Sequence, residues 1–199
     1  YQLMALIFFV NIVLSMLISS ESQNHDLQKL NHINSIIEPI KDFFSRFGIK
    51  MASILLLIVA TYRLTDIVMG PMANPFYIDM GYTLEEIGYI VKVVALIATI
   101  FGVFLGGILI KRIGLYKSLI IGGVLVMFTN LFFSYAALSE KNLTLLASIV
   151  ASDSIAAGIV GTVNITFLTS LVSQKYTGFQ YALLTSLMAF LGKIFAGFS

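Results

Sequence analysis

Charge and cysteine are what this sequence has least of. Only 12 basic and 10 acidic residues occur among its 199 residues, so charged side chains make up 11% of the chain, whereas a soluble domain has roughly a quarter. A water-facing surface of ordinary charge density cannot be built from so few. Cysteine is absent, which excludes disulfides and thiolate metal sites. The net charge of +2 is small and gives no indication of a nucleic-acid partner.

The sequence also lacks the motifs by which many enzymes are recognised. It contains no HExxH, no GxSxG, no P-loop and no cysteine nucleophile. Its two histidines, His25 and His32, lie in one polar stretch, so neither a metal centre nor another cofactor is expected. An intramembrane aspartate pair, Asp66 with Asp153, is conceivable, but neither residue stands in a recognisable protease motif. We therefore expect a protein that is not an enzyme.

Long apolar runs make up most of what is present, and hydrophobic residues account for 58% of the chain. A helix that crosses the hydrocarbon core needs about 20 mainly apolar residues, and open strands cannot face lipid. The sequence therefore predicts an all-α membrane protein, a bundle of about six transmembrane helices. Gly70, Pro71 and Pro75 mark the expected end of the second helix. The six apolar runs are 2–19, 50–71, 87–110, 115–138, 143–172 and 180–199.

The connector 20–49 differs from the others because it is long and partly polar. Isoleucines and phenylalanines recur at helical spacing over residues 33–47, with charged residues between them. This pattern predicts an amphipathic helix in the membrane interface, or alternatively a helix packed against the bundle. Pro39 predicts a kink or a helix start within the pattern.

Basic residues in the connectors predict the orientation of the bundle, since Lys and Arg are enriched on the cytoplasmic side. If the connector 20–49 lies on the cytoplasmic side, Lys141 is the single basic connector residue on the opposite side, where it stands among several acidic residues. The basic residues on the inner side are then Lys29, Lys41, Arg46, Lys50, Lys111, Arg112, Lys117 and Lys175.

Five charged residues remain inside the expected spans: Arg63, Asp66, Lys92, Asp153 and Lys193. Each costs about 2.5 kcal/mol or more at the bilayer centre, so such residues normally face the bundle interior. Arg63 and Asp66 are three residues apart on one helix face and can pair. Counted at about 1.5 Å per residue from the predicted span ends, Lys92, Asp153 and Lys193 lie with Asp66 in the outer half of the membrane. One polar cavity there could hold all the charges. Three cations against two anions make that cavity positive, which suits an anionic solute.

Several of these residues also have a purely structural interpretation. Arg63 and Lys92 lie near span ends and could extend to the interface, and the aspartates could serve only in structural pairs. The serines and threonines around Asp153 could line a water-filled path or hydrogen-bond between helices. Gly102 and Gly106 form a GxxxG pair, which favours close helix packing.

The loop near residue 110 resembles that of a known family. The sequence Gly106-Gly107-Ile-Leu-Ile-Lys111-Arg112-Ile-Gly114 resembles the short basic loop between the second and third helices in each half of Major Facilitator Superfamily transporters. It departs from that pattern at Ile110-Lys111, where an acidic residue often stands in the superfamily.

Three further stretches narrow the resemblance to the AmpG muropeptide permeases. In that family a Tyr-Lys-x-x-Asp motif opens the second half and a lysine follows in the next helix. The Gly192-Lys193 pair resembles a Gly-Arg pair of the eleventh helix, with lysine in place of arginine. The three stretches are Tyr62-Arg63-Leu-Thr-Asp66, Ile87-Gly88-Tyr-Ile-Val-Lys92 and Gln180-Tyr181-Ala182-Leu183-Leu184.

The resemblance covers nearly the whole chain and implies a domain organisation. Residues 1–19 would be the last helix of the N-terminal half, 20–49 a cytoplasmic linker with an amphipathic helix, and 50–199 the C-terminal six-helix half, truncated in its fifth helix. The chain begins and ends in apolar runs without a signal peptide. We therefore expect an internal piece of a longer protein, whose missing half is a partner in the same chain or a separate one.

The resemblance also implies a function. This is proton-driven import of anhydro-muropeptides, wall-recycling fragments linked to β-lactamase induction, across a Gram-negative inner membrane. Asp66 and Asp153 would carry protons, and the expected solute and charge network consists of Tyr62, Arg63, Lys92 and Lys193. The partners would then be an anionic small molecule, the lipid bilayer and the missing half. An acetyl-coenzyme A-like anion is the alternative solute, and a non-transporting remnant or membrane interaction subunit is the alternative function.

Overall fold

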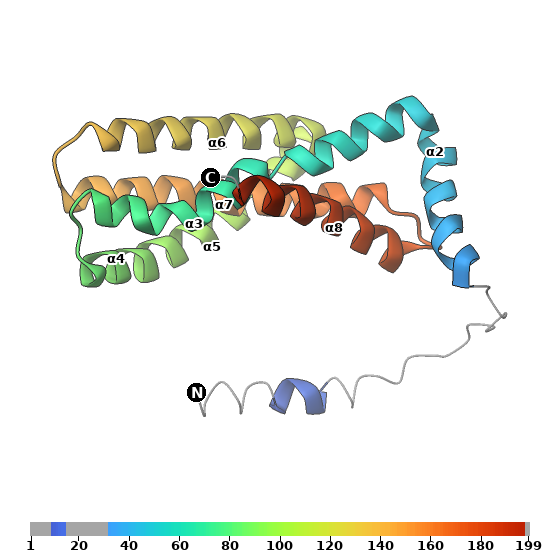
Figure 1. Ribbon diagram of the computed structural model, residues 1–199, viewed down its shortest axis with the longest axis horizontal. Coiled ribbons are helices and arrows are strands. Elements are labelled where there is room, and N and C mark those ends of the chain that lie inside the picture. Colours follow the sequence, from blue (N-terminus) through green and yellow to red (C-terminus); the bar gives the residue numbers. More distant parts are fainter. Residues whose placement is uncertain (1–8, 15–31, 198–199) are drawn as a thin grey trace. The chain divides into compact units, whose positions relative to one another are not determined.

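The computed structural model describes residues 9–14 and 32–197 (Figure 1). The chain divides into two compact units, residues 1–37 and Glu38–Ser199, which are described separately. In the first unit, residues 9–14 are helical, and the rest of the span expected at 2–19 lies outside the described residues. The named helices are α2 (His32–Thr61), α3 (Leu64–Asp79), α4 (Leu84–Ile90), the π-helix η1 (Val91–Ala95), α5 (Leu96–Ile113), α6 (Leu115–Ala137), α7 (Leu143–Leu171) and α8 (Thr177–Ala196).

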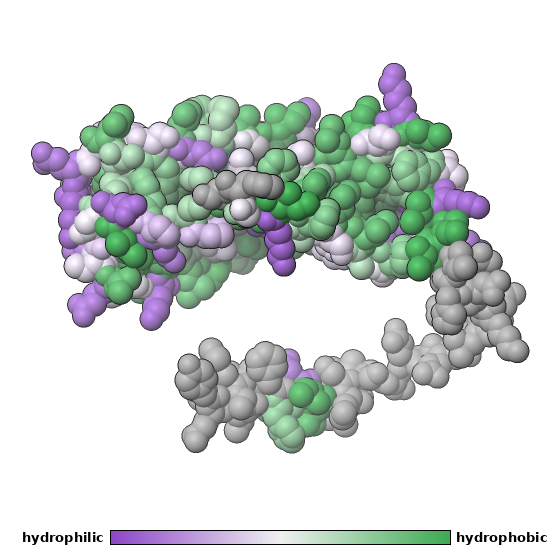
Figure 2. Space-filling view, viewed as in Figure 1, coloured by the Kyte–Doolittle hydropathy of each residue, from purple (hydrophilic) through white to green (hydrophobic). Residues whose placement is uncertain are grey.

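The described residues contain five helical stretches that are long and apolar enough to cross a membrane. They are Ile36–Asp79, Leu84–Ile113, Leu115–Ala137, Leu143–Leu171 and Thr177–Ala196. In the view of Figure 2 the second unit is mainly hydrophobic, and its hydrophilic residues gather mostly toward the two ends. The prediction of an all-α membrane bundle is confirmed.

The first of these stretches differs from the prediction in where the helix is interrupted. The expected end at Gly70 is wrong, because α3 continues through Pro71 and Pro75 as far as Asp79. A proline removes only one backbone donor, and neighbouring helices commonly stabilise such positions in membrane helices. Here α3 packs along α8. The interruption lies instead between Thr61 and Leu64, where α2 ends and α3 begins.

Helix α2 contains the amphipathic segment and changes direction after it (Figure 1). Pro39 is fully buried within the helix, and the change of direction occurs at Gly48 instead. Gly48 has φ 71° and ψ 156°, a backbone conformation that essentially only glycine adopts. Phe43 is 5% exposed and belongs to the bundle core, with Phe44 and Phe47 packed beside it. The amphipathic segment therefore packs against the bundle through its phenylalanines, whereas Ile36 and Ile37 are exposed.

Helix α7 lies at the centre of the second unit, between α5 and α6. Its contact with α5 depends on glycine, because a Cβ at Gly102 would collide with the Ile155 carbonyl oxygen and one at Gly158 would collide with the α5 backbone near Thr99. Gly106 lies against Ile159 in the same way. The close packing favoured by the GxxxG pair is therefore present.

The buried apolar residues form two separate cores. The first core includes Val59 of α2, Leu119 of α6 and Ile159 of α7. The second core includes Tyr77 of α3, Phe133 of α6 and Val150 of α7. Helices α6 and α7, and α2 followed by α3, therefore each pass from one core to the other. A short polar layer lies between the two cores.

Candidate functional site

The polar layer between the two cores encloses a cavity of about 210 Å³. Three helices supply its walls: α3 with the turn before it, α6, and α7. The lining residues are Arg63, Thr65, Asp66, Met69, Gly70, Ala73, Asn130, Phe133, Asp153 and Ala157. Both predicted proton carriers, Asp66 and Asp153, and one of the predicted cations, Arg63, therefore share one cavity.

Arg63 and Asp66 form an ion pair at the start of α3. The distance from Arg63 Nε to Asp66 Oδ2 is 3.3 Å, and the two side chains are 34% and 20% exposed. The helix interruption creates this geometry, because Arg63 becomes the N-cap residue of α3 and Asp66 falls in its first turn. A carboxylate in the first turn is also stabilised by the helix dipole.

Tyr62 fixes the interruption in place without lining the cavity. Its hydroxyl donates a hydrogen bond of 3.1 Å to the backbone oxygen of Leu119 on α6. The same hydroxyl lies so close to Gly122 that a Cβ there would stand 2.6 Å from it. Tyr62 therefore positions its neighbour Arg63 at the cavity.

Asp153 enters the cavity from α7 and is only partly buried. Within residues 36–197, the ion pairs are Arg46 with Asp42, Arg63 with Asp66, and Lys141 with Glu86, so Asp153 has no basic partner there. The two aspartates thus share a cavity but differ in charge environment.

Lys92 and Lys193 do not line this cavity, and both are exposed. Lys92 lies in η1, the π-helical turn between α4 and α5. Lys193 follows Gly192, which packs against Ile67 of α3. The cavity walls therefore carry two carboxylates and one guanidinium, so the positive cavity expected from five charges is not formed by these residues.

The loop motif surrounds the junction of α5 and α6. Gly114 has φ 85° and ψ 165°, a conformation that glycine provides, and its carbonyl accepts a hydrogen bond from Ser118 Oγ at 2.7 Å. Lys111 and Arg112 are exposed in the last turn of α5, where cations are favoured by the helix dipole. A Cβ at Gly107 would meet no other atom within 4 Å.

Sequence reasoning missed two polar cavity residues, Asn130 and Thr65. Asn130 is an amide within an otherwise apolar span, which is the signal that could have identified it, because burying a polar group is unfavourable unless it has a partner. Thr65 lies beside the identified Arg63–Asp66 motif.

Fold and site together define a multi-pass α-helical membrane protein that holds ionisable groups between two apolar cores. The chain belongs to the Major Facilitator Superfamily, whose family model matches residues 1–197. It is 38% identical over 154 residues to AmpG 4 of Rickettsia conorii, an alignment that covers 77% of this chain and 36% of that protein.

Two other relatives are similar along almost the whole chain. AmpG 1 of Rickettsia bellii is 28% identical over 98% of this chain and 49% of its own length. The anhydromuropeptide permease of Escherichia coli is 27% identical over 99% of this chain and 39% of its own length. The resemblance to AmpG permeases is thus confirmed, and the chain spans less than half the length of these relatives.

Proposed function

We propose that this chain forms the C-terminal half of a proton-coupled transporter that imports anhydro-muropeptides across the inner membrane. The names of the family and of the relatives point to transport rather than catalysis. The observation that carries the proposal is the cavity between the two cores, which contains Asp66 from α3 and Asp153 from α7.

The two aspartates are the proposed proton carriers. A buried carboxylate is unfavourable when it lacks a partner, and proton uptake removes its charge. Asp66 has Arg63 as a counter-ion, whereas Asp153 has no ion pair within residues 36–197. A proton on Asp153 therefore relieves the cost of its charge when the cavity closes to water, and renewed hydration allows its release.

The solute binds outside this cavity. A volume of about 210 Å³ is smaller than the roughly 300–1,000 Å³ of pockets that enclose drug-sized ligands, and a sugar-peptide is at least of that size. In transporters built from two halves, the solute site lies between them near the midplane. Exposed Lys92 and Lys193 are the proposed partners for solute carboxylates at that interface, together with the partly exposed Arg63, which Tyr62 positions.

Uptake by membrane vesicles tests the function and the solute together. Vesicles carrying the complete transporter that contains this half should accumulate radiolabelled anhydro-muropeptide when a proton gradient is imposed, and an uncoupler should abolish the accumulation. Unlabelled acetyl-coenzyme A should compete poorly. Strong competition would favour the alternative anion, and absence of uptake despite correct insertion would favour a non-transporting interaction subunit.

A further inference from the structure

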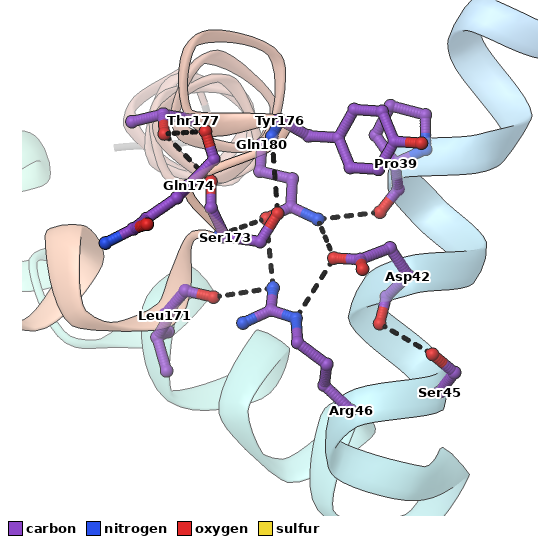
Figure 3. Close-up of polar contacts among 10 residues, drawn as sticks. All are labelled: Pro39, Asp42, Ser45, Arg46, Leu171, Ser173, Gln174, Tyr176, Thr177 and Gln180. Carbon is purple, nitrogen blue, oxygen red and sulfur yellow. Dashed lines mark hydrogen bonds and ion pairs between the residues drawn. The ribbon is translucent and has the colours of Figure 1, made fainter.

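Gln180, in the first turns of α8, is a buried amide with every hydrogen-bonding position occupied (Figure 3). The residue is 2% exposed. Its Nε2 donates to the Pro39 oxygen at 2.8 Å and to Asp42 Oδ2 at 2.9 Å. Its Oε1 accepts from Arg46 Nη2 at 3.0 Å and from the Ser173 backbone N–H at 2.7 Å. An amide offers two donors and two acceptor positions, so none remains free.

Arg46 and Asp42 complete this arrangement from α2. Arg46 Nε lies 3.0 Å from Asp42 Oδ2, and Arg46 Nη2 also donates to the Leu171 oxygen at 3.0 Å. Leu171 ends α7, where the last carbonyls of a helix lack intrahelical partners. Figure 3 shows both α2 side chains pointing toward Gln180. We call Asp42, Arg46 and Gln180 the clasp, since they join α2, α7 and α8.

A second contact connects the same elements. The Tyr176 hydroxyl, just before α8, donates to Glu38 Oε2 of α2 at 3.0 Å. Glu38 is also the residue at which the second compact unit begins. Glu38 and the clasp therefore hold the start of this unit to the turn between α7 and α8.

Gly48 follows the clasp by two residues and separates it from the membrane part of α2, residues 49–61. Its φ of 71° excludes an ordinary helical path, and a Cβ built there would meet nothing within 4 Å. Glycine is thus required at this position by the backbone conformation and not by lack of space.

We propose that the clasp and Gly48 form an anchored hinge. The clasp keeps residues 38–47 attached to the α7–α8 turn as one body, and the membrane part of α2 changes its angle to that body at Gly48. Detaching the segment would break the hydrogen bonds of the buried Gln180 amide to Pro39, Asp42 and Arg46, and an unpaired buried amide is unfavourable. The movement serves opening and closing of the half on its cytoplasmic side, so this functional part rests on the proposed transport function.

Spin-label distances can test the hinge without any transport measurement. The chain has no native cysteine, so labels can replace exposed Lys41 and Leu183 to report on the clasped body. Labels at Lys41 and Leu57 report across Gly48, since Leu57 is 63% exposed. In the full chain in lipid nanodiscs, the first pair should give one narrow distance distribution. The second pair should give a broader distribution with more than one distance.

Substitutions then separate the clasp from the hinge. Gln180→Leu should broaden the Lys41–Leu183 distribution at least twofold. Gln174→Leu should not, because Gln174 lies in the turn between α7 and α8 with an exposed side chain that makes no hydrogen bond. Gly48→Ala should shift the Lys41–Leu57 distribution, whereas Gly123→Ala, at a helical glycine with open space, should not. Should Gln180→Leu fail to fold, Asp42→Ala tests the same bonds, because it removes the oxygen that accepts from Gln180 Nε2 and Arg46 Nε.

The clasp and the hinge are each tested by one label pair. An equally narrow Lys41–Leu183 distribution in Gln180→Leu and Asp42→Ala would overturn the clasp. A Lys41–Leu57 distribution in the parent chain as narrow as that of the Lys41–Leu183 pair would overturn the hinge. Neither result depends on uptake, so loss of the proposed transport function in the vesicle assay remains distinguishable from loss of the hinge.

Discussion

Two opposite faces of α7 contact very different surroundings. At about 100° per residue, Ile155 and Gly158 point to one side of the helix and Asp153 and Ala157 to the other. The first side packs onto the α5 backbone with no room for an added methyl group, and the second lines a polar cavity. A close glycine-mediated contact resists relative movement of helices, whereas a cavity lined by charges can change its hydration. We infer that α5 and α7 move together and that adjustment takes place at the cavity.

The largest expected effect comes from breaking the close contact. Gly102→Ala places a methyl group against the Ile155 carbonyl, and overpacking of this kind costs about 1–3 kcal/mol or more. Gly107→Ala is the matched control, since the same methyl group there meets open space and favours the helix by about 0.5–1 kcal/mol. Melting temperatures in detergent should therefore fall for Gly102→Ala only. Equal melting temperatures would show that α5 and α7 pack loosely.

A smaller effect is expected on the cavity side. Arg63→Gln leaves Asp66 without its counter-ion. Because the pair is partly exposed, the free energy of unfolding should fall by about 1 kcal/mol, less than for a fully buried pair. Arg112→Gln, at an exposed position, should change stability by less than about 0.5 kcal/mol. Denaturant-induced unfolding in detergent measures both variants. A stability loss for Arg63→Gln equal to the control would mean that solvent already screens the pair.

The sequence was sufficient to predict the bundle, because the hydrocarbon thickness fixes the length of an apolar helix regardless of its packing. Four of the observed spans lie within a few residues of the predicted runs at 87–110, 115–138, 143–172 and 180–199. The interruption at Tyr62 was not predicted, because the apolar run continues on both sides of the charged Arg63 and Asp66. What marks it is a tertiary hydrogen bond from Tyr62 to α6.

The candidate site was predictable in its parts but not in its assembly. Asp66, Arg63 and Asp153 were identified from the cost of charge in lipid, and they line one cavity. Lys92 and Lys193 met the same criterion but lie elsewhere, because the direction of a side chain depends on helix rotation. The π-helical turn containing Lys92 alters that rotation locally, and no sequence pattern indicated it.

The central claim is that the carboxylates between the two cores carry the coupled proton. In the complete transporter, Asp66→Asn and Asp153→Asn should each reduce proton-driven accumulation of labelled anhydro-muropeptide at least tenfold, since asparagine keeps the size but cannot carry a proton. Exchange of labelled for unlabelled solute across the membrane, which requires no net proton movement, should continue. Detergent melting of the same variants shows whether the protein remains folded. Uphill accumulation at the parent level by both folded variants would contradict the claim.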